Sequence, residues 1–300
     1  MRGAHLPCHH FTAPMAHECV ASWHRLVASR PPCLAARPRG RCVAGSRHRA
    51  HRVVASSVIG SQAVMTAERL QLLERMCAAE VAAENYQRAA ALRDERVALL
   101  DGLAEEERSV QLALLELRTA GTPASRRIAA ATTIAAVGDA SLARVLAPAL
   151  HDADVSVAEA VEAALWALWG KSGVAEVDAL MQKGMSALKA APLAGEEALK
   201  DALEAFSQAA AALPTFAEAH NKQATVLFIL RRYQQSLMVC RTVVKLEPCH
   251  FGALSGAAMC CVNAGDDAEA VQWFKQALAV NPRLDGARQY IDNWKRRRDV

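Results

Sequence analysis

The chain has 300 residues, of which 52% are hydrophobic but only 5% aromatic, because alanine supplies much of the apolar content. This composition favours helix, the length allows more than one domain, and no window reaches the ~18 uninterrupted apolar residues of a membrane span. Residues 1–60 hold nine Arg and one Glu (+8), so residues 61–300 sum to −4 within a net charge of +4. A mildly acidic body disfavours nucleic acid as the main partner, since phosphate binding needs a basic face.

Residues 1–60 are predicted to be a disordered transit peptide. Apart from Glu18 they contain no acid, and they have scattered Pro, Ser and Ala without a sustained apolar period, which is typical of organelle targeting segments. The phrases around Ala44 and Ala55 resemble plastid processing sites, so we expect the chloroplast, with the mitochondrion as the alternative. The other interpretation is a disordered basic tail of a cytosolic protein.

Residues 66–103 are expected to form an antiparallel helical hairpin. Thr66 is the predicted N-cap of the first helix, and apolar residues then recur at helical spacing. The phrase "YQRAAALRDE" resembles the UVR motif. That resemblance implies a protein-contact element of repair subunits and of Clp-type chaperones and their adaptors, with Tyr86, Arg93 and Asp94 as contact candidates. The alternative is that Arg93 and Asp94 only solvate the hairpin.

Residues 104–122 are predicted to form a connecting helix, and residues 124–172 three helices separated by turns. Asp139 and Asp152 lie where turns and helix N-caps favour a short carboxylate. The phrases "AAVGD" and "LAPALHDADVSV" resemble HEAT-type repeats, which implies a helical segment that stacks on its neighbours.

Two tryptophans, Trp166 and Trp169, lie on the last of these three helices but off its main apolar stripe. We expect a second neighbouring element to cover them as part of a core. Nothing acidic or phosphate-binding accompanies them that would indicate a ligand site.

Residues 174–298 contain a 34-residue repeat, marked by Pro214, Pro248 and Pro282 at equal spacing. This period is typical of a stacked helix–turn–helix unit, and "AEAHNKQATVLFILRRYQQSL" followed by "LEPCHFGALSG" resembles the tetratricopeptide repeat (TPR) of bacterial and plastid proteins. The resemblance implies three units and a capping end helix. The expected fold is an all-α solenoid of TPR-like repeats, preceded by HEAT-like helices, a UVR-like helical hairpin and a disordered N-terminus.

The phrase "EPCHF" sets Cys249 beside His250, which raises the question of a metal or redox site. Both fall in the linker between two units, and the chain has no CxxC pair and no nucleotide-binding, hydrolase or zinc-protease motif. His250 is expected to be solvated or to cap the next helix. Cys240, Cys260 and Cys261 fall on packing positions. We therefore expect no metal, no cofactor and no enzymatic activity, and leave open whether an exposed Cys249 is oxidised.

Protein binding is the function that remains, and the TPR resemblance implies a concave groove lined by the first helix of each unit. Ser255 and Met259 stand where repeats that grip acidic chaperone tails carry Lys and Asn, so an apolar helical or extended segment is expected instead. The alternative is that other helices of the chain cover part of the groove. The groove candidates are Glu218, Asn221, Thr225, Phe228, Ile229, Ser255, Met259, Val262 and Asn263.

The function expected from the sequence is a non-enzymatic adaptor or scaffold in an organelle, whose hairpin and groove engage different proteins in quality control or complex assembly. Two alternatives remain: a structural or regulatory subunit of one permanent complex, and an accessory factor in nucleic-acid processing, suggested by the repair-protein motif. The cations at 295–298 are interpreted as completing a helix C-terminus. The oligomeric state is left open.

Overall fold

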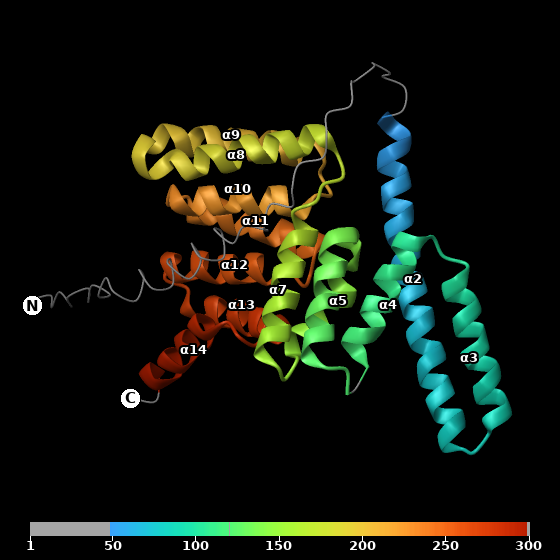
Figure 1. Ribbon diagram of the computed structural model, residues 1–300. Helices are drawn as coiled ribbons and strands as arrows, with labels where there is room; N and C mark the ends of the chain where they lie inside the picture. The colour runs from blue at the N-terminus through green and yellow to red at the C-terminus, as the bar shows by residue number, and fades with distance from the viewer. Residues whose placement is uncertain (1–48, 120, 299–300) are drawn as a thin grey trace, which may run out of the picture.

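A computed structural model describes residues 49–119 and 121–298, and every regular element in those residues is a helix (Figure 1). The prediction of an all-α chain that ends in stacked helical hairpins is confirmed. Residues 1–48, which hold most of the predicted transit peptide, lie outside the described part of the chain. Among the described helices, none combines the length and the apolar character that a membrane crossing requires.

The first two helices form the antiparallel hairpin expected from the sequence: α2 (Arg49–Ala82) packs along α3 (Tyr86–Asp101). The prediction that Thr66 begins the first helix was wrong, because α2 runs through this residue and buries its side chain. The helix extends further toward its N-terminus because Ala63 and Ala67 pack in the same core as residues of α4. Tertiary packing has overridden a local capping signal.

A group of helices follows in the ranges expected for the connecting and HEAT-like segments. One of them, α4, packs on α5, which in turn packs on α7. The middle of the three expected helices is broken into short turns, since Pro148 cannot supply the N–H that a continuous helix would need. The elements are α4 (Glu105–Arg118), α5 (Ala124–Val137), η1 (Ala140–Leu142), α6 (Ala143–Leu146), η2 (Ala147–His151) and α7 (Val155–Trp169).

Three hairpins and an end helix form the stack. The first hairpin is the longest, because an insertion extends both of its helices. Its helices pack closely at Gly184, where a Cβ would lie 2.6 Å from the ring of Phe206. The elements are α8 (Ala175–Ala194), α9 (Glu196–Ala212), α10 (Ala217–Ile229), α11 (Tyr233–Leu246), α12 (Phe251–Ala264), α13 (Asp267–Val280) and α14 (Asp285–Arg298).

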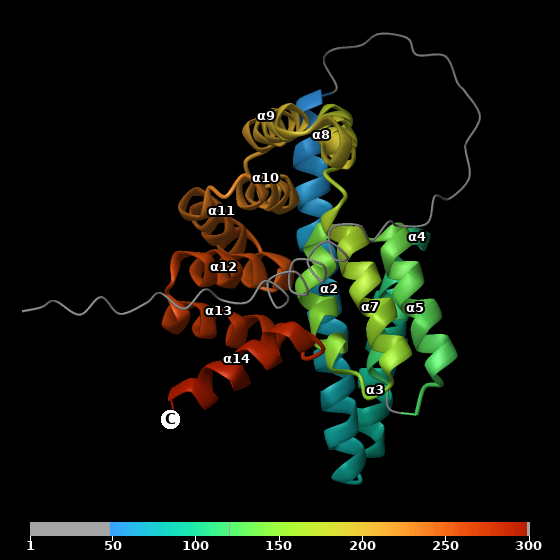
Figure 2. The ribbon, with the colours of Figure 1, turned by 90° about the vertical axis from the view of Figure 1, so that its left-hand side faces the viewer.

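One hydrophobic core joins the N-terminal helices to the stack. It contains side chains of α2, α4, α5 and α7 together with Phe251, Cys249, Val280 and Leu284, which come from the linkers between hairpins and from their ends. Figure 2 shows α5 and α7 on one side of the stack, with α9 and α11 on the side facing away from them. The described helices therefore pack as neighbours rather than as separate units on a flexible chain.

Candidate protein-interaction surfaces

The C-terminal end of α7 meets the linker between the second and third hairpins. Trp169 stacks on the imidazole of His250, with ring centroids 4.2 Å apart and planes at 18°. Trp166 meets the rings of His250 and Phe251 edge to face, at 5.5 and 5.2 Å. The prediction that a second element covers both tryptophans is confirmed, and that element is the repeat stack.

A buried polar network lies next to these aromatic rings. The Glu218 carboxylate on α10 accepts a hydrogen bond from Asn221 at 2.9 Å, pairs with Lys222 at 3.0 Å and lies 3.1 Å from Nε2 of His250. Nδ1 of His250 accepts from the N–H of Ala253 at 3.1 Å and so caps α12. Because Nδ1 is an acceptor, Nε2 carries the proton and donates to Glu218.

The charge of Glu218 is held by these partners. Burial alone would raise the pKa of this carboxyl, but the positive charge of Lys222 and the hydrogen bond from His250 outweigh burial and lower the pKa to about 2. Glu218 is therefore ionised at neutral pH, and removing Lys222 would leave its buried charge without a counter-charge.

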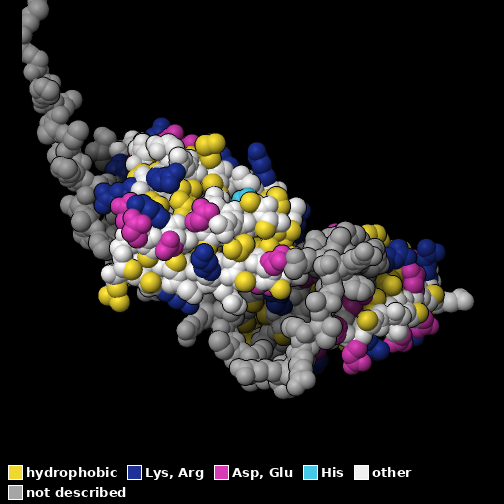
Figure 3. All heavy atoms as spheres, turned by 90° about the horizontal axis from the view of Figure 1, so that it is seen from above, with side chains coloured by type: hydrophobic (Ala, Val, Ile, Leu, Met, Phe, Trp, Pro, Cys, Tyr) yellow, Lys and Arg dark blue, Asp and Glu magenta, His cyan; other side chains and the backbone are white. Residues whose placement is uncertain are grey.

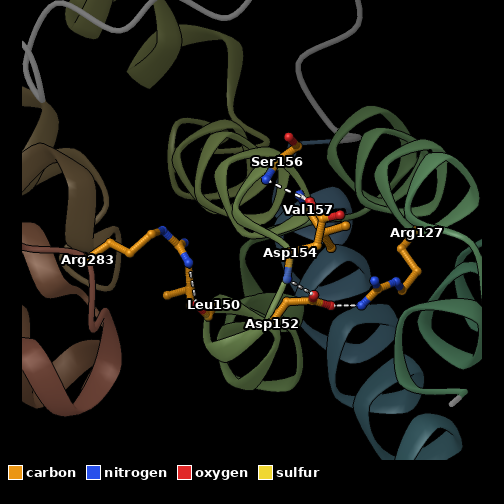
Figure 4. Close-up of polar contacts among 7 residues, drawn as sticks. All are labelled: Arg127, Leu150, Asp152, Asp154, Ser156, Val157 and Arg283. Carbon is orange, nitrogen blue, oxygen red and sulfur yellow. Dashed lines mark hydrogen bonds and ion pairs between the residues drawn. The ribbon is translucent and has the colours of Figure 1, made fainter. Parts of the chain in front are cut away.

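The N-terminal end of α7 is bonded to neighbours on two sides (Figure 4). Asp154 caps α7 by accepting from N–H groups of its first turn, at 2.9 and 3.3 Å. Asp152 accepts from the N–H of Asp154 at 2.8 Å and pairs with Arg127 of α5. On the other side, Arg283 from the linker before α14 donates to the carbonyl of Leu150 at 2.9 Å. Helix α7 and its preceding turn therefore contact two successive linkers of the stack.

Four further polar contacts join the same two parts of the chain. They are Arg144 Nε to the Glu247 carboxylate at 3.3 Å, Arg144 Nη2 to the Leu246 carbonyl at 2.9 Å, Asn281 Nδ2 to the Glu162 carboxylate at 2.9 Å, and His151 Nε2 to the Ala279 carbonyl at 3.1 Å.

Cys249 and His250 lie in this joint between α7 and the repeat stack, not in an exposed linker as the sequence suggested. His250 caps α12, as one interpretation expected, but its side chain is 0% exposed, so it is not solvated. The Cys249 thiol is half-buried and donates to the Glu247 carboxylate at 3.1 Å. Burial, followed by the charge of Glu247, raises the pKa of this thiol well above its ordinary value. Such a thiol is a poor nucleophile.

Not predicted from the sequence were the ion pair of Lys222 with Glu218 and the buried contacts of His250 with Glu218 and Trp169. Glu218 lies four residues before Lys222 on the same helix, but its contact with His250 and the contacts of Trp166 and Trp169 join helices distant in the chain, and no local spacing records those. The available signal was indirect: two tryptophans lie off the apolar stripe of their own helix, and a His–Phe pair stands at the start of another helix.

The nine predicted groove residues lie on α10 and α12, in the register the repeat implies. At the end next to α7, Lys222 lies 5.9 Å from the centroid of the Trp166 ring, and a Cβ at Gly252 would come within 2.6 Å of that ring. This end is covered by the chain itself. At the opposite end Ile229 and Val262 are partly exposed. The buried members of the nine predicted groove residues are Glu218, Asn221, Thr225, Phe228, Ser255 and Met259, and Asn263 is exposed.

The UVR-like contact candidates lie on the outer face of α3. Tyr86 is 66% exposed, and the side chains of Arg93 and Asp94 are 62% and 71% exposed and pair with each other at 3.2 Å. The opposite face of α3, with Leu92 and Leu100, is buried. The three candidates are therefore accessible, and their contact role stays a prediction.

An open cleft of about 930 Å³ lies between α2, the α6 region and the stack. Val64 and Met65 line it on one side, Val145 and Phe216 on others, and the charged Arg144 is already paired across it. Its wall mixes apolar and charged side chains.

The cysteines and acids of the described residues form no metal centre. Within that part of the chain no three His, Cys, Asp or Glu side chains are grouped to hold an ion. Cys240, Cys260 and Cys261 are buried, in agreement with their predicted packing positions.

Residues 174–298 thus combine a 34-residue period, paired helices and close contacts at small residues. The chain is 32% identical over 124 residues to a TPR repeat-containing protein from Rhizobium etli, which is 41% of this chain and 58% of that protein. The repeats are TPR-like. The chain spans little more than half of this relative's length. No protein-family model matches the chain, so the UVR and HEAT resemblances stay predictions.

Several solved TPR structures are similar to the chain at low identity. The first TPR of Spaghetti (RPAP3) bound to an HSP90 peptide matches 42% of this chain and 94% of its own, at 16% identity and a TM-score of 0.38. YrrB, a TPR protein with an unusual peptide-binding site, matches 72% of this chain and 88% of its own, at 15% identity and a TM-score of 0.34. A thermophilic TPR protein from Thermus thermophilus matches 74% of this chain and 97% of its own, at 18% identity and a TM-score of 0.31. Similarity at this level identifies no ligand.

Proposed function

We propose that the chain is a non-enzymatic adaptor that binds two different proteins, one in the groove of the TPR-like stack and one on the α3 face of the hairpin. The observation that carries the proposal is the position of the two surfaces. They lie on different parts of one structure and are held in place by the core that α2, α7 and the stack share.

The open end of the groove supports an apolar segment as its ligand. Ile229 and Val262 present partly exposed apolar side chains there, next to Asn263, an exposed residue whose amide donates to the Met259 carbonyl at 2.9 Å. The other end, with Glu218, is covered by Trp166 and its charge is neutralised within the chain. A segment that binds by apolar contact at the open end, as a helix or an extended peptide, fits this division.

The cellular setting of the proposal rests on the leader and on the UVR resemblance. We propose a role in protein quality control or complex assembly in the chloroplast, with the mitochondrion as the alternative. A fluorescent fusion of residues 1–60 that enters the plastid would support this destination, and a fusion that stays in the cytosol would contradict it.

Substitutions on the two surfaces test the adaptor function. Ile229→Asp with Val262→Asp should remove one set of co-purified proteins, and Tyr86→Ala with Arg93→Ala a different set. Leu193→Asp is the matched control for the groove, because Leu193 is 98% exposed in the last turn of α8. Arg75→Ala, exposed on α2, serves the same purpose for the hairpin.

A second candidate, a subunit of one permanent complex, is favoured by the shared core, which gives the two surfaces a fixed relation. In that case both pairs of substitutions would remove the same proteins. A nucleic-acid role would instead appear as RNA retained at low salt and released at high salt, which the acidic body disfavours.

A further inference from the structure

We propose that the chain forms a two-fold symmetric dimer through the outer face of α9 and α11. These are the second helices of the first two hairpins, and Figure 2 shows both on the side of the stack that faces away from α5 and α7. Neither this face nor its occupant enters the proposed function, so the two can be tested separately.

The outer face of α11 and the turn that precedes it are basic. Residues 231–245 contain four cations and no acid. Met238, between the cations, is 68% exposed, and among the described residues only Arg241 has a carboxylate partner, Glu269 at 2.5 Å. The four exposed cations are Arg231, Arg232, Arg241 and Lys245.

The outer face of α9 has the opposite sign. The helix carries four exposed acids and one cation, Lys200, which pairs with Glu196 at 3.5 Å and Glu197 at 2.8 Å. Asp201 and Glu204 have no cationic partner in the described part of the chain. Figure 3, which looks onto the α8–α9 end of the stack, shows acidic and basic side chains close together there.

The 34-residue period brings the two faces into register. Glu197 and Arg231 occupy equivalent positions of successive units, as do Glu204 and Met238. A two-fold axis parallel to the helices and midway between them would lay α9 of each copy on α11 of the other. Glu197 would then lie level with Arg231, and Glu204 one turn from Arg241.

A self-complementary face of this kind points to a second copy rather than to a foreign acidic protein. An acidic partner would need the basic α11 face alone, whereas an isologous dimer uses the acidic and the basic helix twice. Exposed ion pairs are individually weak and are screened by salt. We therefore expect a dimer of modest affinity that dissociates at high salt, with its register set by charge.

Charge-swap variants of the full chain test the dimer by sedimentation velocity at low salt. Variant one carries Arg231→Glu and Arg232→Glu, and variant two carries Glu197→Lys and Asp201→Lys. Each alone should be monomeric, because both of its contacts are now between like charges. Mixed in equal amounts, they should form a one-to-one heterodimer, because both contacts become attractive again.

The matched control is Lys183→Glu with Lys189→Glu, which changes net charge as variant one does but lies on α8, where both lysines are exposed. It should remain dimeric. Circular dichroism verifies that each variant is folded. The dimer is overturned if the unaltered chain is monomeric at low salt, if either variant still self-associates, or if the mixture stays monomeric. Proteins captured by the groove or the hairpin should be unchanged in both variants, which separates this result from the adaptor function.

Discussion

Glu218 makes the joint between α7 and the stack sensitive to acid. The pKa of its carboxyl lies at about 2 in the folded chain, below its ordinary 4.5. The stability that comes from its ionised form is therefore complete above pH 4.5 and is lost as the pH falls from 4.5 to about 2. The shift corresponds to about 3 kcal/mol. Urea unfolding followed across this range should show the loss.

Glu218→Gln should reduce this part of the pH dependence. At neutral pH it should also cost about 3 kcal/mol, because Lys222 is left buried without its counter-charge. Glu68→Gln on the exposed surface of α2 is the control and should leave the unfolding free energy within about 0.5 kcal/mol. An unchanged acid response in Glu218→Gln would show that other carboxyls govern it.

Gly252 allows α7 to approach the third hairpin. A Cβ at this position would lie 2.6 Å from Cη2 of Trp166, so Gly252→Ala should destabilise the chain by about 1–3 kcal/mol through overpacking. Combining it with Trp166→Leu should lower that cost. Gly102→Ala is the control, since its nearest neighbours are carbonyl oxygens at 3.5 and 3.7 Å. Equal thermal melting midpoints for Gly252→Ala and Gly102→Ala would contradict the close approach.

At the scale of single residues, the sequence indicated that two tryptophans pack against a second element, but it did not identify that element. Trp166 and Trp169 were expected to have a second neighbour, because they leave the apolar stripe of their own helix. The neighbour proved to be His250 and Phe251. A periodic pattern records which side of a helix is apolar, but it does not record which distant helix covers that side.

The contact between α7 and α12 depends on Trp169. Its indole stacks on His250, whose Nδ1 in turn accepts from the N–H of Ala253. Trp169→Ala should lower the free energy of unfolding by about 3–5 kcal/mol. The variant should increase the rate of amide hydrogen exchange more at the start of α12 than at its end. Trp294→Ala on α14 is a suitable comparison, because this tryptophan is only partly buried and should change exchange mainly in α14.

Helices were predictable where local signals and packing agree. The hairpin at 66–103, the segments at 104–122 and 124–172 and the 34-residue units all contain helices in their expected ranges. The start of α2 was not predictable, because Thr66 is a good N-cap by type yet is buried inside a longer helix. The break at Pro148 could have been anticipated from the proline itself.

For the molecule as a whole, the repeat stack should depend on the helices that precede it. A fragment of residues 174–298 would expose Phe251 and His250, which are buried in the full chain. It should melt at a lower temperature than the full chain and recover part of the difference when a fragment of residues 49–173 is added. Circular dichroism melting curves measure both effects, and a fragment as stable as the full chain would show that the joint contributes little.

Helix α7 also limits where the stack can gain units. A solenoid usually lengthens by adding units, since each one contacts only its neighbours. Here the 15 residues of α7 extend about 22 Å. The C-terminal end of α7 contacts His250 in one linker, and the turn before α7 contacts Arg283 in the next linker. A unit inserted between these linkers would carry Arg283 away from Leu150. Growth by duplication is therefore blocked between these two linkers, and variants with extra repeats should gain them only ahead of α10 or beyond α14.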